Sequence, residues 1–585
     1  MKKISPLVAG LCALTTFSSH SYSEETKKTK FALEEVIVTA QKKAESLQDT
    51  PISLTAFGEE RLEIDGISNL NDIGAKVPSL TIEPFPINNA TLRIFIRGVG
   101  ISDVQVTQDP PVGIYVDGVY IARSTGTALD VAELQRIEVL RGPQGTLYGR
   151  NTTGGAINMI TKRPSVEALE FKQKFTVGNR GNFTSKTSAN IPISDTVAAK
   201  VAYLNTRMDG FIENTGPGGD FGDKEVSGYR IDLRWDISDS FTLDYAYDNS
   251  DYEYYNYNYQ SIRPAEMNKG QAEPVREYSV SQSKYSEQRF DKMETFSPFE
   301  ASNTEISGHS FILTKDFEQF QLKYIGSYRE LYDAAYADLN GGVGSEDYRV
   351  DSNVYCGISA REQTGEDCLP LVVPQINQEQ FSHELQFTGS FLDGGIDYIT
   401  GIYYFEEEAV EDNSPVHHQF SSKISEGVFP APGVGGVLLD GGDVHLVNML
   451  SQRYDVKNTA LAAYGQFTWT PKFLDERMHL TFGARLSQDE REALKNQTDK
   501  TYIEIRSYDT VVDMEDAGPF APAFTQAGFK IPGDRSFQDI YGKKDFDDTS
   551  FSFITEFDLT DDINIYGKFV EAYKSGGFNT RDPQR

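Results

Sequence analysis

The chain has 585 residues, a formal net charge of -32 and an aromatic content of 12%, with 31 Tyr and 36 Phe. Its length predicts at least two structural units, its acidity argues against binding to nucleic acid, whose phosphates select basic surfaces, and no apolar run of about 18 residues is present to form a transmembrane helix. Many aromatic residues in a chain that is only 39% hydrophobic are typical of a membrane β-barrel, in which alternate residues face lipid and aromatic side chains line both interfaces.

Residues 1–23 have the pattern of a cleaved secretory signal peptide. Lys2 and Lys3 precede the apolar residues 6–14, and small residues follow. A lipid anchor at Cys12 is disfavoured, because the residue before it is a leucine rather than a small residue. We therefore expect an exported protein.

Cleavage of the signal peptide removes Cys12 and leaves two cysteines, Cys356 and Cys368, in a polar stretch of the chain. In an oxidising compartment, two thiols this close in sequence are expected to form a short-loop disulfide. Two thiols alone are a poor metal site, and the adjacent His417 and His418 lack the spacing of metal ligands. We expect no metal and no cofactor.

Residues 24–46 are rich in Lys, Thr, Glu and Gln and contain one apolar island, LEEVIVTA, at 33–40. This composition predicts a flexible segment with a strand-like centre. By propensity alone, the island could equally be the first strand of the domain that follows.

A compact mixed α/β unit is predicted for residues 47–165. Its first elements are a strand in PISLTAFG at 51–58, an acidic helix at 59–64 and a helix from Ser68, whose hydroxyl can cap it, to residue 76. Short β-type runs separated by Gly, Pro, Asn and Asp then lie at 93–96, 113–121, 135–140 and 155–161.

The glycine spacing near residues 142–149 does not indicate a nucleotide site. Arg150 and Asn151 stand where a phosphate loop requires Lys followed by Ser or Thr. An ordinary soluble α+β domain remains possible for this region on fold-level grounds alone.

From residue 166 onward, apolar and polar residues alternate with a period of two, as in Ile231, Leu233 and Trp235 against Asp232 and Arg234. We predict about thirteen strands of about 10 residues. They are centred or begin near residues 168, 183, 196, 228, 241, 303, 319, 379, 396, 457, 477, 547 and 563.

The connections between these strands alternate in length. Tight turns are predicted at 193–196, 237–241, 315–319, 392–396 and 559–563, and long polar excursions at 209–227, 250–302, 332–378, 408–456 and 488–544. A soluble sandwich has no reason to segregate short turns from long loops, so the pattern predicts an antiparallel transmembrane barrel.

An odd number of strands does not close a bacterial single-chain barrel, which has an even count. The last predicted strand, INIYGKFVEAY at 563–573, leads into KSGGFNTRDPQR, which resembles the start of an extracellular loop. We therefore expect a C-terminally incomplete barrel, about 22 strands when complete, lacking roughly nine of them.

Three motifs carry a family resemblance. IRG at 96–98, YVDGVY at 115–120 and IEVLRGPQGTLYGRNTTGGAINMITKRP at 137–164 resemble the plug of a TonB-dependent outer-membrane receptor. The resemblance implies an α/β plug at 47–165 inside the lumen of an all-β barrel at 166–585, embedded in the lipid of the bacterial outer membrane.

The same resemblance implies that the island before the plug is a TonB box, the peptide that pairs edge to edge with a strand of the TonB-type energy-coupling protein of the inner membrane. It would comprise Glu35, Val36, Ile37, Val38, Thr39 and Ala40. β-Branched residues hold its backbone extended, and flanking charge keeps it soluble.

By resemblance, Arg97 and Arg141 are the plug arginines that pair with barrel-wall glutamates, and Glu384 in HELQF and Glu571 in VEAYKSGGF are the wall candidates. Buried guanidinium–carboxylate pairs suit such a plug–barrel latch, since either partner is costly to leave alone. Either glutamate could also be an ordinary lumen-facing residue.

The cargo implied by the resemblance is a scarce nutrient, most commonly a ferric siderophore, with carbohydrate and cobalamin left open. The tyrosines at 252, 254, 255, 257 and 259 could pack a chelate or form an interfacial girdle. The acidic run at 406–412 is interpreted as a solvated loop base.

No catalytic residues are predicted, because no pair of convergent carboxylates is fixed on identifiable elements as a secreted glycosidase would require. A secreted β-rich enzyme and a surface adhesin remain the alternatives from other classes. An adhesin would need neither the island at 33–40 nor a plug.

Overall fold

The computed structural model describes residues 36–585 except 68, 87, 126–132, 217, 258–259, 261, 263–285, 294–300, 337–354, 357–368, 371–373, 414–415, 424–426, 430–436, 440–442, 474, 506–509, 514–536, 561–562 and 580–585. The predicted signal peptide, Glu35 and Cys368 lie outside the described residues, and so does the side chain of Cys356. The predicted disulfide therefore stays a prediction. Residues from Ile37 to the end form one compact unit.

Two small sheets build the plug. In the larger, only β7 and β10 are parallel neighbours. Its strand order is β3 (Leu54–Gly58), β9 (Leu134–Arg141), β10 (Gly155–Thr161), β7 (Val112–Val116) and β8 (Val119–Ile121). The smaller sheet contains β4 (Leu80–Phe85), β5 (Asn88–Ile96) and β6 (Val99–Gly100).

Two short helices complete the plug, α1 (Glu59–Ile64) and α2 (Leu70–Ile73). The helix predicted from Ser68 to residue 76 is shorter than expected. It begins after Asn69, whose backbone N–H donates to Asp72 Oδ2 at 3.1 Å and so closes the first turn.

The plug core lies among both sheets and both helices. It is made of aliphatic side chains with one Phe and one Met, namely Phe57, Leu62, Leu70, Ile73, Val77, Leu80, Leu92, Ile94, Ile96, Val112, Ile114, Val116, Ile137, Val139, Ile157 and Met159. Because these residues alternate along their strands, each strand has one face for this core and one for other contacts.

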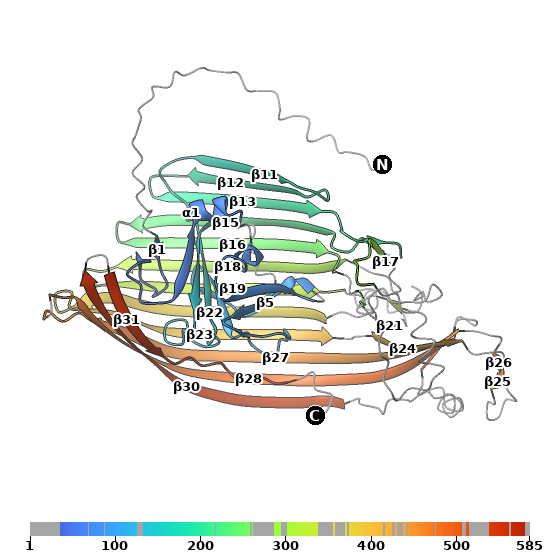
Figure 1. The fold of residues 1–585 in the computed structure, drawn as a ribbon. Helices are drawn as coiled ribbons and strands as arrows, with labels where there is room; N and C mark the ends of the chain where they lie inside the picture. Colours follow the sequence, from blue (N-terminus) through green and yellow to red (C-terminus); the bar gives the residue numbers. More distant parts are fainter. Residues whose placement is uncertain are drawn as a thin grey trace, which may run out of the picture. The chain divides into compact units, whose positions relative to one another are not determined.

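Thirteen strands follow the plug, and each pairs antiparallel with the next in chain order (Figure 1). They are β11 (Glu170–Val177), β12 (Phe183–Pro192), β13 (Val197–Met208), β15 (Lys224–Ser238), β16 (Phe241–Tyr254), β18 (Ser302–Asp316), β19 (Phe320–Ala334), β22 (Pro374–Phe391), β23 (Ile396–Asn413), β27 (Asp443–Trp469), β28 (Met478–Ile505), β30 (Phe537–Thr560) and β31 (Ile563–Val570). The predicted all-β class and strand positions are confirmed, and so are the tight turns at 193–196, 237–241, 315–319 and 392–396. The turn predicted at 559–563 includes residues outside the described ranges.

Strand length differs from the prediction. β27, β28 and β30 have 27, 28 and 24 residues, so much of 408–456 and 488–544 is strand rather than loop. The polar residues there still alternate and still pair across strands, as Lys457 Nζ does with Glu408 at 2.6 Å. The main-chain pairing of these strands therefore continues into segments whose hydrophobic pattern does not predict a strand.

Two shorter strands pair with this sheet, and other short strands form separate two-stranded sheets. β24 (Val416–Lys423) pairs with β27 and β29 (Thr510–Asp513) pairs with β28. Three further two-stranded pairs are β14 (Glu213–Asn214) with β17 (Lys292–Met293), β20 (Tyr355–Cys356) with β21 (Leu369–Pro370), and β25 (Gly427–Phe429) with β26 (Val437–Leu439).

The two faces of the long sheet differ in chemistry. One face carries large exposed apolar and aromatic side chains, among them Val201, Tyr203, Tyr229, Ile231, Trp235, Phe311, Phe381, Ile402, Leu461 and Phe551. The alternate positions are buried and often polar, such as Lys200, Arg230 and Glu384. None of the helices within the described ranges is long and apolar enough to cross a membrane.

Candidate functional site: ion pairs between plug and barrel wall

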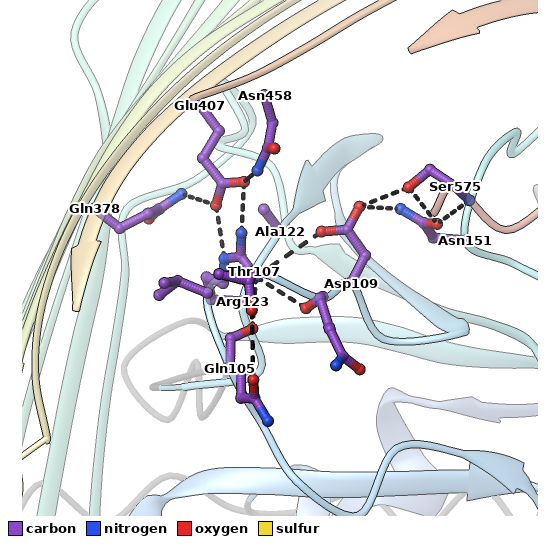
Figure 2. Close-up of polar contacts among 12 residues, drawn as sticks. Gln105, Thr107, Asp109, Ala122, Arg123, Asn151, Gln378, Glu407, Asn458 and Ser575 are labelled. Carbon is purple, nitrogen blue, oxygen red and sulfur yellow. Dashed lines mark hydrogen bonds and ion pairs between the residues drawn. The ribbon is translucent and has the colours of Figure 1, made fainter. Parts of the chain in front are cut away.

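A buried ion pair joins the plug to strand β23 (Figure 2). Arg123 Nε and Nη2 each donate to one carboxylate oxygen of Glu407, both at 2.7 Å. Gln378 and Asn458 on neighbouring strands also donate to Glu407, at 3.1 and 2.8 Å. The bidentate contact between Arg123 and Glu407 fixes the orientation of the guanidinium as well as its position.

Asp109 lies at the centre of a larger network. It accepts from Arg491 of β28 and lies 3.4 Å from Arg150 Nη1 and 3.8 Å from Arg123 Nη1. Arg150 also donates to Asp489 of β28 at 3.0 Å. With Glu407 included, the network contains three arginines and three carboxylates, so its charges balance. These six side chains are at most 6% exposed: Arg123, Arg150, Arg491, Asp109, Asp489 and Glu407.

The protonation of Asp109 follows from this surrounding charge. Burial alone would raise the pKa of Asp109, but the charges of Arg491, Arg150 and Arg123 outweigh burial and hold the pKa well below its ordinary value. Asp109 is therefore ionised throughout the physiological range, and the network stays charged.

The segment after β31 also contacts this network. Asn151 N donates to the carbonyl oxygen of Tyr573 at 2.9 Å, and Arg491 donates to Ser575 Oγ at 2.6 Å. Farther along, Phe578 N donates to the carbonyl oxygen of Thr107 at 3.2 Å. Residues predicted to start an extracellular loop therefore pack against the plug.

Asp117, in the turn between β7 and β8, makes a second contact with the wall. It lies 3.3 Å from Arg230 Nη2 of β15 and 3.4 Å from Arg163 Nη2, and it accepts from Thr161 Oγ1 at 2.8 Å. Burial raises the pKa of Asp117, but the two arginines overcome that effect and lower it.

The predicted TonB box is folded against the plug from Ile37 onward. β1 (Ile37–Val38) pairs antiparallel with β2 (Glu45–Ser46). Val38 and Ala40 are buried, and Thr39 N donates to Glu138 Oε1 of β9 at 2.8 Å. The main chain of this segment is thus already engaged.

The segment from residue 37 to 50, called the linker from here on, is also tied to the barrel wall. Lys42 forms a buried ion pair with Glu384 of β22, which also accepts from Tyr464 Oη at 2.6 Å. Lys43 pairs with Asp397 at 2.6 Å at a more exposed position. Burial lowers the pKa of Lys42, with Glu384 opposing that effect.

The predicted plug–barrel latch has a different arrangement from the one expected. Arg97 is exposed and donates to Ser53 Oγ at 3.2 Å, and Arg141 is half-buried with an Nε that lacks a hydrogen-bond partner. Glu571 is exposed and accepts from Phe551 N at 3.2 Å. Over the described residues, neither arginine pairs with Glu384 or Glu571; the structure brings Glu384 to Lys42.

Glu407 was not predicted as a site residue, and the interpretation of the acidic run at 406–412 as a loop base is wrong. That run is the end of β23, so its residues alternate between faces. Glu407 and Glu411 are buried, and Glu411 accepts from Val106 N at 3.1 Å. The alternation that starts at Ile396 was the available signal.

The tyrosines near residue 254 divide between two environments. Tyr252 and Tyr254 point inward and are buried in a cluster with Val106 of the plug, and Tyr254 Oη donates to Asn88 Oδ1 at 2.7 Å. Tyr257 is 41% exposed and packs on Phe211. Because Tyr252 and Tyr254 are buried, they do not belong to an outward-facing aromatic girdle.

Comparison with known proteins agrees with this architecture. Residues 46–156 match the family model TonB-dependent Receptor Plug Domain. The pesticin receptor of Yersinia pestis is 31% identical over 222 residues, which cover 38% of this chain and 31% of that protein. The iron-regulated outer membrane virulence protein of Vibrio cholerae serotype O1 (strain ATCC 39541 / Classical Ogawa 395 / O395) is 27% identical over 250 residues, 41% of this chain and 36% of the relative. The matched regions thus span about a third of each relative.

Among solved structures, the ferric yersiniabactin uptake receptor FyuA from Yersinia pestis superposes with a TM-score of 0.60 at 18% identity. The superposition covers 91% of this chain and 66% of that one. At this level of identity the likeness establishes the fold.

The fold and the wall contacts define a β-barrel sheet with a folded plug joined to its inner face. Residues 46–156 match the TonB-dependent receptor plug domain, and the chain shares the fold of the ferric yersiniabactin uptake receptor. The resemblance inferred from the sequence is confirmed. The predicted location in the bacterial outer membrane agrees with the name of the Vibrio cholerae relative.

Proposed function

We propose that this protein binds a ferric siderophore at the cell surface and transports it across the outer membrane, driven by a TonB-type protein of the inner membrane. The named cargo of the structural relative, ferric yersiniabactin, and the plug domain support this class of cargo and mechanism. In this proposal the protein is a transporter rather than an enzyme, an adhesin or a secreted hydrolase.

The observation that carries the proposal is the engaged state of the linker. Ile37 and Val38 pair with β2, and Lys42 is held by Glu384. A partner that recognises the segment by strand pairing needs its main chain free. Release of the linker from the plug and wall would therefore control access of the energy-coupling partner.

The ion pairs explain why external energy is needed. Moving the plug away from the wall would separate Arg123 from Glu407 and Asp109 from Arg491, two ion pairs that are buried in this structure. Breaking a buried pair by removing one partner costs about 3–5 kcal/mol. Ligand binding alone would have to overcome several such costs at once, whereas a mechanical pull on the linker supplies work directly.

The test is a transport assay in cells that lack other receptors for the same cargo. We expect Ile37→Pro to abolish uptake of 55Fe-labelled ferric yersiniabactin, because proline removes a pairing donor and distorts the strand, while surface binding persists. Ile37→Val is the matched control and should transport normally. Undiminished uptake by the proline variant would refute the role of the linker, and saturable uptake of cyanocobalamin or a maltodextrin instead of the iron complex would refute the cargo.

A further inference from the structure

A small internal cavity of about 20 Å³ lies where the linker, the plug and the barrel wall meet. Its lining includes Lys42 of the linker, Tyr120 and Arg150 of the plug, and Glu384, Tyr403 and Arg485 of the wall. A volume of this size has room for one particle of about the size of a water molecule.

Arg485 is the unusual member of this lining. It is 5% exposed, and its Nε donates to Ser487 Oγ at 3.2 Å. The guanidinium carbon lies 5.5 Å from the ring centre of Tyr464 and packs against Gly149, where a Cβ atom would come within 2.5 Å of it. Throughout the described parts of the chain, Arg485 makes no ion pair, whereas Lys42 and Arg150 each have a carboxylate partner.

Several hydrogen-bond donors line the cavity. The hydroxyl of Tyr403 and Nε of Arg150 are buried without a hydrogen-bond partner, and both residues line the cavity together with the guanidinium of Arg485. Glu384 also lines it, but its carboxylate already accepts from Lys42 and Tyr464. A water molecule would bring two donors of its own into this set, whereas an anion only accepts.

We propose that this cavity binds one small monovalent anion of the size of chloride, held by Arg485 and the Tyr403 hydroxyl. A buried guanidinium without a counter-charge is strongly unfavourable, and an anion removes that cost while satisfying the orphaned donors. The site lies against Lys42 of the linker, Arg150 of the plug and Arg485 of the wall, so the anion stabilises the contact of linker and plug with the wall. This binding is independent of which cargo the protein transports.

The first test measures thermal stability in detergent as chloride replaces gluconate at constant ionic strength, because gluconate is too large for the cavity. We expect the wild-type Tm to rise with chloride and to saturate. Tyr403→Phe should shift the chloride midpoint about tenfold upward, as expected for one lost hydrogen bond to a charged group, and Arg485→Gln should abolish the response.

The matched control is Tyr404→Phe. Tyr404 is the next residue along β23, faces outward and donates to Glu406 at 2.6 Å, so this variant should keep the wild-type chloride response. If Arg485→Gln does not fold, Tyr403→Phe still tests the site, because it retains the cation.

A second test is direct. Crystals of the wild-type protein soaked in bromide should give one anomalous peak at hydrogen-bond distance from Arg485 and Tyr403, and crystals of Tyr403→Phe a weaker one. A wild-type cavity that gives no anomalous peak, or a Tm that responds equally to chloride and gluconate, would overturn the proposal in favour of a bound water.

Discussion

Lys42 and Glu384 form a buried ion pair although 342 residues separate them in the chain. Lys42 belongs to the linker and Glu384 to barrel strand β22, so the pair connects the N-terminal linker with the barrel wall. The neighbouring pair of Lys43 with Asp397 is about half exposed and provides a natural comparison.

We expect Lys42→Gln to loosen the linker, because it leaves the Glu384 carboxylate buried without its cation. Hydrogen exchange followed by mass spectrometry should show faster exchange of residues 37–46. The control Lys43→Gln should change exchange little, since exposed ion pairs contribute only about 0–1 kcal/mol. Equal protection in the wild type and the Lys42 variant would mean that this pair does not hold the linker.

Arg123 and Glu407 should be strongly coupled energetically. Arg123→Gln and Glu407→Gln are each expected to lower the free energy of unfolding by about 3–5 kcal/mol, because each leaves a buried charge. The double variant should cost less than the sum of the two. Denaturant unfolding of the wild type, the two single variants and the double variant measures the coupling. Arg453→Gln, which breaks a half-exposed pair with Asp412, serves as the control. Strictly additive effects of the two substitutions would argue against a direct interaction.

The linker should be pH-sensitive through Glu45, whose main chain pairs with Val38. Burial raises the pKa of Glu45 from 4.5 to about 7, with Lys43 opposing. The docked state therefore favours the protonated form, so docking is strongest below pH 4.5 and weakens as pH rises toward 7. Exchange of residues 37–46, corrected for intrinsic rates, should be faster at pH 8 than at pH 5.5, and Glu45→Gln should remove the difference. A Gln variant with the full pH dependence would assign the effect to another group.

Gly401 makes room for the tyrosine that supports Glu384. A Cβ atom at Gly401 would lie 2.6 Å from Cζ and Oη of Tyr464. Gly401→Ala should displace the Tyr464 hydroxyl from Glu384 and increase linker exchange, and Tyr464→Phe should do the same more mildly. Gly465→Ala, where the nearest atom is 3.3 Å away, is the control. Should all three variants exchange like the wild type, the Tyr464 hydrogen bond has no part in holding the linker.

The disulfide predicted between Cys356 and Cys368 concerns residues outside the described side chains. In an oxidising compartment these thiols should be bridged. The loop closure should restrict the unfolded segment by about 3 kcal/mol in the chain-entropy model. Mass spectrometry without reductant, on protein from isolated outer membranes, checks this. Quantitative alkylation of both thiols before reduction would show that they are free.

The amino-acid sequence by itself determined the two-part architecture and the faces of the strands. Alternation such as Ile231, Asp232, Leu233 is local, so it specifies both the strand and its apolar face before any packing partner is known. Motifs such as YVDGVY at 115–120 indicated the plug through their resemblance to a known family.

Tertiary structure decided which charges meet. Arg123 and Glu407 are 284 residues apart, and no local pattern selects Glu407 over Glu406 or Glu408 as the partner. That choice depends on the strand phase, which turns Glu407 inward, and on register, which sets its height beside the plug. The partner of Glu384 was also decided by tertiary structure. Glu384 was predicted as a wall carboxylate, but it pairs with Lys42 rather than with Arg97 or Arg141. An ion pair forms with whichever cation the packed chain brings within reach.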